Sequence, residues 1–394
     1  MPDRQLTVLV APDSFGGALD SVGVGAAIAA GWSRVRPADT VLRRPMADGG
    51  EGTLAAVAEA LGEAAERRST ETTDALGRPI SADWLLIDGG RGAFVEMAAA
   101  SGLARLTPEE RTPANARVAS TRGTGDLLRA ALDAGVERIT LGLGGSATTD
   151  GGSGMLRQLG LTLLDRDGAE LPDGGAALAS IGPRSGAAAL DPRLAGTKIV
   201  IASDVTNPLV GPRGAAATYG PQKGADAAAI GELDAALDAW GRWIERTTGR
   251  LVADLPGSGA AGGTTAGLLG FTSAVVRPGA EVVAELVGLA EALEDADLVI
   301  TGEGRADEQT LHGKAAMGVA SLARPRGTPV ALLCGGLGPN AGALEAATAI
   351  GVVQPIVDGP TELATAMADT ERLLEAAAAR LARSVGIGLE LARP

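Results

Sequence analysis

The sequence is poor in cysteine and histidine, with one of each among its 394 residues. The single cysteine, Cys334, excludes an internal disulfide, and one cysteine with one histidine is too few for a zinc site of the usual kind. Any bound metal is therefore expected to be a hard cation held by oxygen ligands, with Mg²⁺ as the default.

Long apolar segments and an excess of positive charge are also missing. No run of eighteen apolar residues occurs, and the first apolar stretch, after Gln5, is too short for the core of a signal peptide. The net charge of -14 would repel nucleic acid and an anionic membrane surface. We therefore expect a cytoplasmic globular protein that binds neither nucleic acid nor membranes.

Glycine is abundant, with 58 residues, and lysine is rare. The glycines gather in short clusters after apolar runs, which indicates many tight turns between strands and helices. The lysines are Lys198, Lys223 and Lys314, among 34 basic residues. Lys223 and Lys314 each lie beside glycine, where a compact ammonium group could reach a phosphate.

Apolar runs alternate with alanine-rich helical patterns, which predicts an α/β fold with a doubly wound parallel sheet. The expected strands are 6–11, 80–86, 93–97, 138–143, 198–203, 298–301, 329–334 and 352–355. The expected helices are 21–34, 53–61, 124–134, 230–247, 280–292, 313–323 and 362–384. The middle of the chain is richer in proline, glycine and irregular loops. We expect residues 1–70 and 279–394 to form a Rossmann-like domain, with residues 71–278 as a second α/β domain inserted into it.

Charged loops follow several of these strands, and ligands of open α/β sheets bind at the carboxyl ends of strands. The loop after residues 298–301 combines acids, bases and glycines that suit a phosphate and its magnesium. Its candidate binding residues are Glu303, Arg305, Asp307, His312 and Lys314.

Two further loops lie near the start of the chain. Asp13 and Ser14 follow the first strand, where the N-terminus of the next helix would attract an anion, although a plain turn explains them equally well. Asp48 and Glu51 lie three residues apart among glycines and could address one cation or one hydroxyl proton. A solvated turn explains this pair about as well.

The loop after residues 138–143 is the richest in glycine. Gly142, Gly144 and Ala147 match the dinucleotide pattern G-x-G-x-x-A, but a wide loop of hydroxyls and glycines follows instead of an immediate helix. An anion-binding nest of backbone N–H groups is therefore the better interpretation. Its candidate residues are Gly144, Gly145, Ser146 and Asp150.

The last two loops supply a possible base and a possible cation. Asp204 could act as a general base or a magnesium ligand, and Asn207 could orient a substrate oxygen, although an Asx turn before Pro208 is an alternative. Lys223 could neutralise a phosphate, although lone charges are usually solvated.

The established catalytic motifs are absent. Gly313-Lys314 lacks the upstream glycine of a Walker A motif. The sequence also contains no set of protein-kinase motifs, no nucleophile elbow and no histidine-based catalytic triad. Phosphoryl transfer by positioning and charge neutralisation needs only carboxylates, cations and anion sites. The residues therefore point to a small-molecule kinase.

Motifs along most of the chain resemble the bacterial glycerate kinases of type 1. They read APDSF, ADGGEGT, EMAAASGL, STRGTG, GGSATTDGG, DVTNPL, GPQKGA and TGEGRADEQTLHGK, in the order of that family, between residues 9 and 319. The resemblance implies a two-domain α/β enzyme with its active site in the cleft between the domains. It also implies ATP with Mg²⁺ as phosphoryl donor, D-glycerate as acceptor, and phosphoglycerate, favouring the 2-phospho isomer, as product.

Under this resemblance Arg122, in STRGTG, becomes a candidate for the glycerate carboxylate or a phosphate, because its planar fork suits bidentate anion binding. One departure affects function. Where the family usually reads DSFKGSL, this chain has Gly16 and Ala18 in place of the lysine and serine. The loss of two polar side chains puts either the catalytic rate or the substrate in question.

The leading hypothesis is an ATP-dependent glycerate kinase. Asp204 is the favoured base, Asp48, Glu51 and Asp150 compete for that role or for magnesium, and Lys223 is the fifth catalytic candidate; Asp48 and Asp204 are the favoured Mg²⁺ ligands. A kinase of another small hydroxy acid, a weakly catalytic glycerate- or phosphate-binding homologue and, last, a dinucleotide oxidoreductase remain as alternatives. The sequence leaves both a monomer and a homodimer open.

Overall fold

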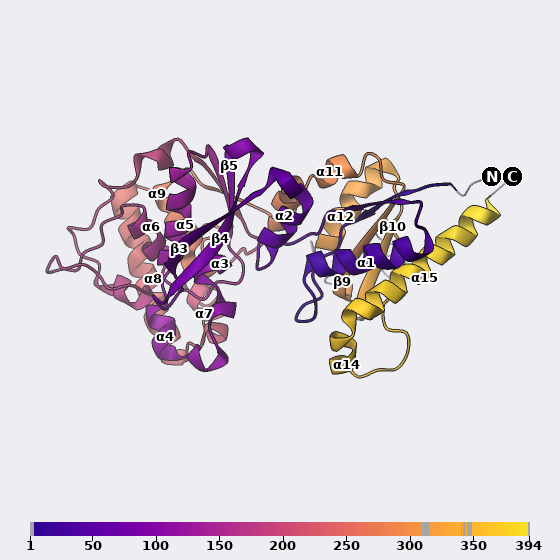
Figure 1. The fold of residues 1–394 in the computed structure, drawn as a ribbon. Coiled ribbons are helices and arrows are strands. Elements are labelled where there is room, and N and C mark those ends of the chain that lie inside the picture. The colour runs from indigo at the N-terminus through magenta and orange to yellow at the C-terminus, as the bar shows by residue number, and fades with distance from the viewer. Residues whose placement is uncertain are drawn as a thin grey trace. The chain divides into compact units, whose positions relative to one another are not determined.

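The computed structural model describes residues 4–308, 310, 315–339, 341, 344 and 349–392. By packing, the chain divides into two compact units (Figure 1). The first contains Met1–Asp48, Ala55–Gly62 and Ala280–Pro394, and the second contains Gly49–Leu54 and Glu63–Gly279. Each unit is α/β, so the predicted fold class is confirmed. The inserted-domain organisation, with boundaries near residues 70 and 279, stays a proposal.

The first unit is built on a five-stranded parallel sheet of order β11-β10-β9-β1-β2. Its strands are β1 (Thr7–Val10), β2 (Thr40–Arg43), β9 (Leu298–Ala306), β10 (Val330–Leu337) and β11 (Ile350–Pro355). Its helices are α1 (Ser21–Val35), most of α2 (Thr53–Leu61) and α10 (Gly279–Leu286), α11 (Leu289–Ala292), α12 (Ala315–Ala323), α14 (Leu363–Ala368) and α15 (Thr370–Leu391). This is the doubly wound parallel arrangement that the sequence predicted.

Helices α1 and α15 run side by side in this unit (Figure 1). They approach closely at Gly31, where an added Cβ would lie 2.2 Å from the backbone oxygen of Glu375. The connections β1-α1-β2 and β9-α12-β10 leave the centre of the sheet in opposite directions. Because such crossovers are right-handed, α1 and α12 cover opposite faces. Apolar side chains of α1, α15 and the strands, including the fully buried Trp32, form the core.

The second unit has a six-stranded mixed sheet of order β3-β4-β5-β6-β7-β8. Its strands are β3 (Glu66–Thr73), β4 (Pro79–Ile87), β5 (Gly92–Glu96), β6 (Arg138–Gly142), β7 (Lys198–Ala202) and β8 (Val275–Arg277). β4 pairs antiparallel with β3 and β5, and the other neighbours are parallel. The helices are α3 (Ala98–Ser101), α4 (Pro113–Val118), α5 (Arg122–Asp133), α6 (Ser153–Gln158), α7 (Ala215–Tyr219), α8 (Ala227–Thr248) and α9 (Ala260–Phe271).

Several elements differ from the sequence prediction. β3 was not expected, because it is a polar edge strand with little apolar pattern to reveal it. α9 was missed because glycine and threonine have low helix propensity, and burial of most of its residues compensates. The predicted helix 280–292 is broken at Gly288, which has a φ of 65°. The predicted helix 362–384 is two helices, separated at Asp369.

Among the helices of the described residues, none combines the length and the apolar character that a membrane crossing requires.

Candidate functional site

The centre of the first sheet is a topological switch point. β1 lies between β9 and β2, and the chain proceeds from β1 towards one edge and from β9 towards the other. Backbone and side-chain hydrogen bonds hold the two strand ends together: Asp13 N donates to Gly302 O at 2.8 Å, and Thr301 Oγ1 donates to Ala11 O at 2.8 Å. Open α/β sheets bind ligands at such a point, outside the carboxyl ends of the strands.

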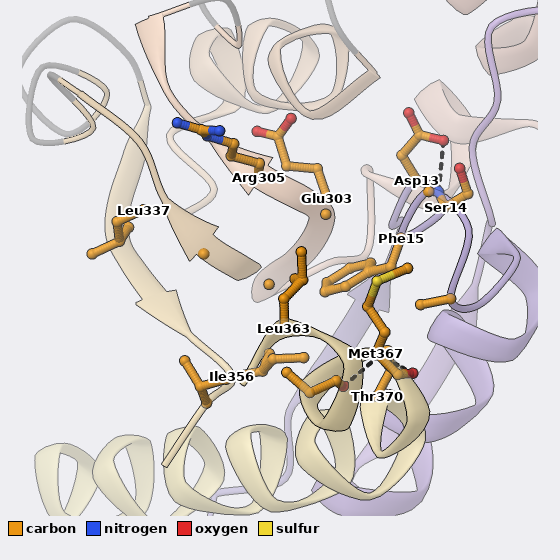
Figure 2. Close-up of a pocket in the computed structure, with 17 residues that line it drawn as sticks. Asp13, Ser14, Phe15, Glu303, Arg305, Leu337, Ile356, Leu363, Met367 and Thr370 are labelled. Carbon is orange, nitrogen blue, oxygen red and sulfur yellow. Dashed lines mark hydrogen bonds between the residues drawn. The ribbon is translucent and has the colours of Figure 1, made fainter. Parts of the chain in front are cut away.

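A pocket of about 700 Å³ opens at this place (Figure 2). The loop after β1 and strand β9 contribute the polar side chains Asp13, Ser14, Glu303 and Arg305 to its wall, and the Thr370 hydroxyl lines it as well. Leu337, Ile356 and side chains of α14 form another part of the wall. The structure therefore brings together four of the predicted binding residues from segments almost 300 positions apart.

Asp13 has an unusual electrostatic environment. Burial is the main reason that the pKa of this carboxyl rises to about 6, and the nearby charges of Asp48 and Glu303 raise it further. A hydrogen bond of 2.6 Å from Ser14 N opposes the shift. A carboxyl with such a pKa can exchange a proton near neutral pH, which general-base catalysis requires.

Glu303 and Arg305 are two residues apart at the end of β9, so their side chains lie on the same face of the strand. The Glu303 side chain is buried, whereas the Arg305 side chain is 65% exposed. The Arg305 guanidinium lies 3.5 Å from Asp307, which leaves most of its donors in reach of a ligand. Glycines at positions 302 and 304 permit close contact with the loop after β1, because a Cβ at either would meet Phe15 within about 3.5 Å.

The helix after β1 begins where the sequence predicted it. α1 starts at Ser21 and is capped by the Asp20 side chain, so a loop of several residues separates Asp13 and Ser14 from the helix N-terminus. Between them the chain closes on itself, with Phe15 N donating to Leu19 O at 2.8 Å. Gly16 and Ala18, the two departures from the family pattern, both line the pocket. The helix N-terminus therefore lies beyond this loop and not directly behind Asp13 and Ser14.

The glycine-rich loop after β6 surrounds a buried carboxylate in the second unit. Asp150 accepts hydrogen bonds from Thr121 N and Thr121 Oγ1, both at 2.8 Å, and from Gly152 N and Gly154 N. Burial raises the pKa of Asp150, and these hydrogen bonds act in the opposite direction. The Asp150 side chain has no exposed surface. Its surroundings favour a role in holding the loop together.

Lys223 lies under the same loop and is also buried. Its ammonium nitrogen donates to Ser146 Oγ at 3.0 Å and to Thr148 O at 2.5 Å. Burial lowers the pKa of Lys223 to about 7, and the charge of Asp150 partly opposes this shift. Gly145 has a φ of 70°, and a Cβ at Gly144 would lie 2.3 Å from Gly50. The structure thus brings Lys223 to the loop that carries Gly144, Gly145, Ser146 and Asp150, and Lys223 donates a hydrogen bond to Ser146.

The buried Lys223 makes stability depend on pH. The lysine loses its proton near pH 7 in the folded protein but near 10.5 when unfolded, so the folded state binds fewer protons between these values. The free energy of unfolding should therefore rise with pH from about 7 upwards by a few kcal/mol in total. In Lys223→Met this slope should be lost.

Urea unfolding between pH 6 and 9.5 measures the effect, and Lys198→Met, at an exposed position, is the matched control. Parallel stability curves for the wild type and Lys223→Met would contradict the lowered pKa.

The loop after β7 holds the favoured base and an asparagine. Asp204 is exposed, and its carboxylate accepts a hydrogen bond of 2.9 Å from Gly279 N. Asn207 donates to Arg213 O at 2.8 Å and accepts from the Tyr219 hydroxyl at 2.9 Å. The amide of Asn207 thus binds its own loop and the end of α7.

The predicted carboxylates Asp48 and Glu51 are both exposed and fall on either side of the boundary between the two units. The residues after Asp48 are tied to the second sheet by Glu96, which sequence reasoning did not single out as a site residue. Its buried carboxylate accepts hydrogen bonds from Gly52 N at 3.1 Å and Leu54 N at 2.8 Å, at the start of α2. Glu96 thus holds the segment that carries Glu51.

The Arg122 side chain is held by an ion pair. Its guanidinium forms two hydrogen bonds with Asp173, of 2.8 and 3.1 Å, and lines a separate pocket of about 370 Å³ with Arg157. Its anion-binding fork is therefore already occupied by a carboxylate. His312 and Lys314 lie outside the described residues.

Sequence reasoning also missed the apolar wall of the first pocket. Its members are spread over three segments, and single apolar residues carry no signal of a shared pocket. The apolar spacing within residues 363–367 was visible, but it was assigned to one long helix.

Comparisons with known proteins agree on one family. A profile of the Glycerate kinase family matches residues 8–386. The glycerate kinase of Halalkalibacterium halodurans is 43% identical over 95% of this chain and 97% of its own length. The glycerate 2-kinase of Escherichia coli is 42% identical over 86% of this chain and 88% of its own. A crystal structure of a putative glycerate kinase 2 from Salmonella typhimurium covers 98% of this chain and all of its own, with 40% identity and a TM-score of 0.85.

The fold and these relatives define an enzyme of the small-molecule kinase class. The chain belongs to the glycerate kinase family.

Proposed function

We propose that this enzyme transfers a phosphoryl group from ATP to D-glycerate and forms 2-phosphoglycerate. The observation that carries the proposal is the pocket at the switch point, where Asp13, Glu303 and Arg305 converge. The names of its relatives support glycerate as the acceptor. Phosphoryl transfer needs positioning and neutralisation of charge, and these residue types provide both.

Asp13 takes the role of general base in this proposal. It accepts the proton of the glycerate hydroxyl as that oxygen attacks the terminal phosphorus and ADP leaves. Its raised pKa suits the task at neutral pH. Asp204, the base favoured by sequence, remains the alternative, but it is exposed and its carboxylate accepts a hydrogen bond from Gly279 N. Arg305 neutralises charge on the transferred phosphoryl group, as an exposed guanidinium can.

Mg²⁺ fits the donors at this end of the pocket. Within the described residues no three side chains of metal-binding types gather closely enough to hold an ion alone. Magnesium that arrives with nucleotide phosphates needs only one or two protein carboxylates, and Glu303 and Asp48 are such donors near Asp13. The ion would neutralise charge on the phosphates. The carboxylates also explain why the ion is needed, because alone they would repel a phosphate.

A coupled assay of ADP release over a panel of short hydroxy acids tests the proposal. We expect D-glycerate to be the preferred acceptor, and phosphorus NMR of the product should show the 2-phospho isomer. ATP binding without ADP release on any acid would instead identify a binding protein. The second candidate function, phosphorylation of another small hydroxy acid, is favoured by Gly16 and Ala18 on the pocket wall, and the same panel decides it.

A further inference from the structure

The pocket at the switch point has two chemically different sides. Figure 2 shows Asp13, Ser14, Glu303 and Arg305 along one side, and Leu337, Ile356, Leu363 and Met367 along the other. We call the apolar side, formed by Leu337, Ile356, Leu363, Ala366 and Met367, the aliphatic wall. A ligand that fills this pocket must therefore have one charged end and one apolar end.

The helix α14 gives the aliphatic wall its shape. Leu363, Ala366 and Met367 are three and four residues apart, so their side chains lie on one face of the helix. Leu363 is 75% exposed and Leu337 is 54% exposed, which is unusual for large apolar side chains that face the same hollow. An apolar surface of this kind is stabilised when a ligand covers it.

Few side chains of the aliphatic wall can bind a polar ligand. The Thr370 hydroxyl, which also lines the pocket, shares its one hydrogen between the backbone oxygens of Ala366 and Met367, at 3.0 and 2.9 Å. Glycerate has a hydroxyl or carboxylate oxygen on every carbon, so burying it here would leave those oxygens without hydrogen bonds. A purine ring is flat and apolar on both faces and gains from such contact.

We propose that the aliphatic wall binds the base of the nucleotide, while the phosphates extend towards Asp13, Glu303 and Arg305. This assignment rests on the proposed function for the identity of the nucleotide. The loop after β1 contributes to both sides of the pocket. It carries Asp13 and Ser14, and at Gly17 it approaches Met367 so closely that an added Cβ would lie 3.4 Å from the Met367 methyl group. The pocket of about 700 Å³ lies in the usual range for ligands larger than glycerate.

Direct binding to the full-length protein tests the assignment. Titration calorimetry would measure ATP, inorganic tripolyphosphate and D-glycerate, each with Mg²⁺, on the wild type and on Leu363→Asp. The exposed position of Leu363 makes unfolding an unexpected outcome, and circular dichroism checks it. We expect the affinity of the variant for ATP to be about tenfold lower, because contact with the base of the nucleotide is lost. Its affinity for tripolyphosphate should be unchanged. Leu363→Ala should have the same effect in a smaller degree.

The matched control is Leu251→Asp, at a leucine that is 72% exposed and lies outside the pocket. This control should bind ATP like the wild type. Unchanged ATP affinity in Leu363→Asp would overturn the assignment, even if the variant bound D-glycerate more weakly. A wild type that does not bind ATP would overturn it as well. If ATP binds but glycerate is not phosphorylated, the proposed function fails. The variants still decide whether the aliphatic wall binds the base of the nucleotide.

Discussion

Asp13→Asn should lower kcat for glycerate phosphorylation by about 100-fold or more, because an amide cannot accept the hydroxyl proton. The substitution keeps the size and shape of the side chain. The KM for ATP should change much less than kcat if Asp13 acts on the proton and not on the nucleotide. Steady-state kinetics of the purified variant measure both values.

Asp204→Asn is the matched comparison, since it makes the same chemical change at the base that the sequence favoured. We expect it to retain more than a tenth of the wild-type kcat. A large loss in Asp204→Asn with a near-normal Asp13→Asn would move the base to Asp204 and remove Asp13 from the proton transfer.

Asp13→Asn also has a predicted effect on stability. The carboxyl has a pKa of about 6 in the folded protein and an ordinary pKa of 3.8 in the unfolded chain, so the folded state binds more protons between these values. Its contribution to stability is present below about pH 4 and is lost as pH rises through 6. The free energy of unfolding of the variant should therefore exceed that of the wild type by about 2 kcal/mol at pH 7 and by little at pH 4. Lower activity with higher stability would distinguish a functional carboxylate from a damaged fold.

Gly16→Lys combined with Ala18→Ser should raise the turnover of glycerate by roughly 10- to 150-fold. The lysine would restore one charge-assisted contact with the reacting phosphate, of a kind that contributes about 1.5–3 kcal/mol. The wild type should be slow, below the 1–100 s⁻¹ typical of kinases.

The structure makes this variant feasible. A Cβ at Gly16 would meet no atom within 4 Å, and its φ is not in the left-handed region. Both changed positions lie on the pocket wall. The N-terminus of α1 could have supplied positive potential in place of the lysine, but α1 starts only at Ser21. This distance supports the expectation that the wild type is slow. Gly231→Lys, at another open glycine outside the pocket, controls for added charge. Wild-type turnover already within the kinase range would show that the lysine is dispensable here.

The sequence by itself determined the elements with strong local patterns and the chemistry at their ends. Buried apolar runs such as residues 298–301 placed the strands, since burial on both faces leaves a continuous hydrophobic signal. The rule that ligands bind at carboxyl ends of strands then selected Asp13 and Glu303, without any knowledge of their contact. β3, polar and at an edge, had no such signal.

Only the tertiary structure decided which of these polar residues share a site. Glu303 and Asp13 share one pocket because β1 and β9 are neighbours in the sheet, a pairing between segments almost 300 residues apart that no local period encodes. The sequence also did not show that Lys223 and Asp150 are buried. Lys223 donates a hydrogen bond to Ser146, and Asp150 accepts hydrogen bonds from the backbone around it. The break at Asp369, which separates α14 from α15, was missed for the same reason. The local spacing of apolar residues indicates whether a segment is a helix or a strand. The pKa and the partners of a side chain depend instead on neighbours that only long-range packing supplies.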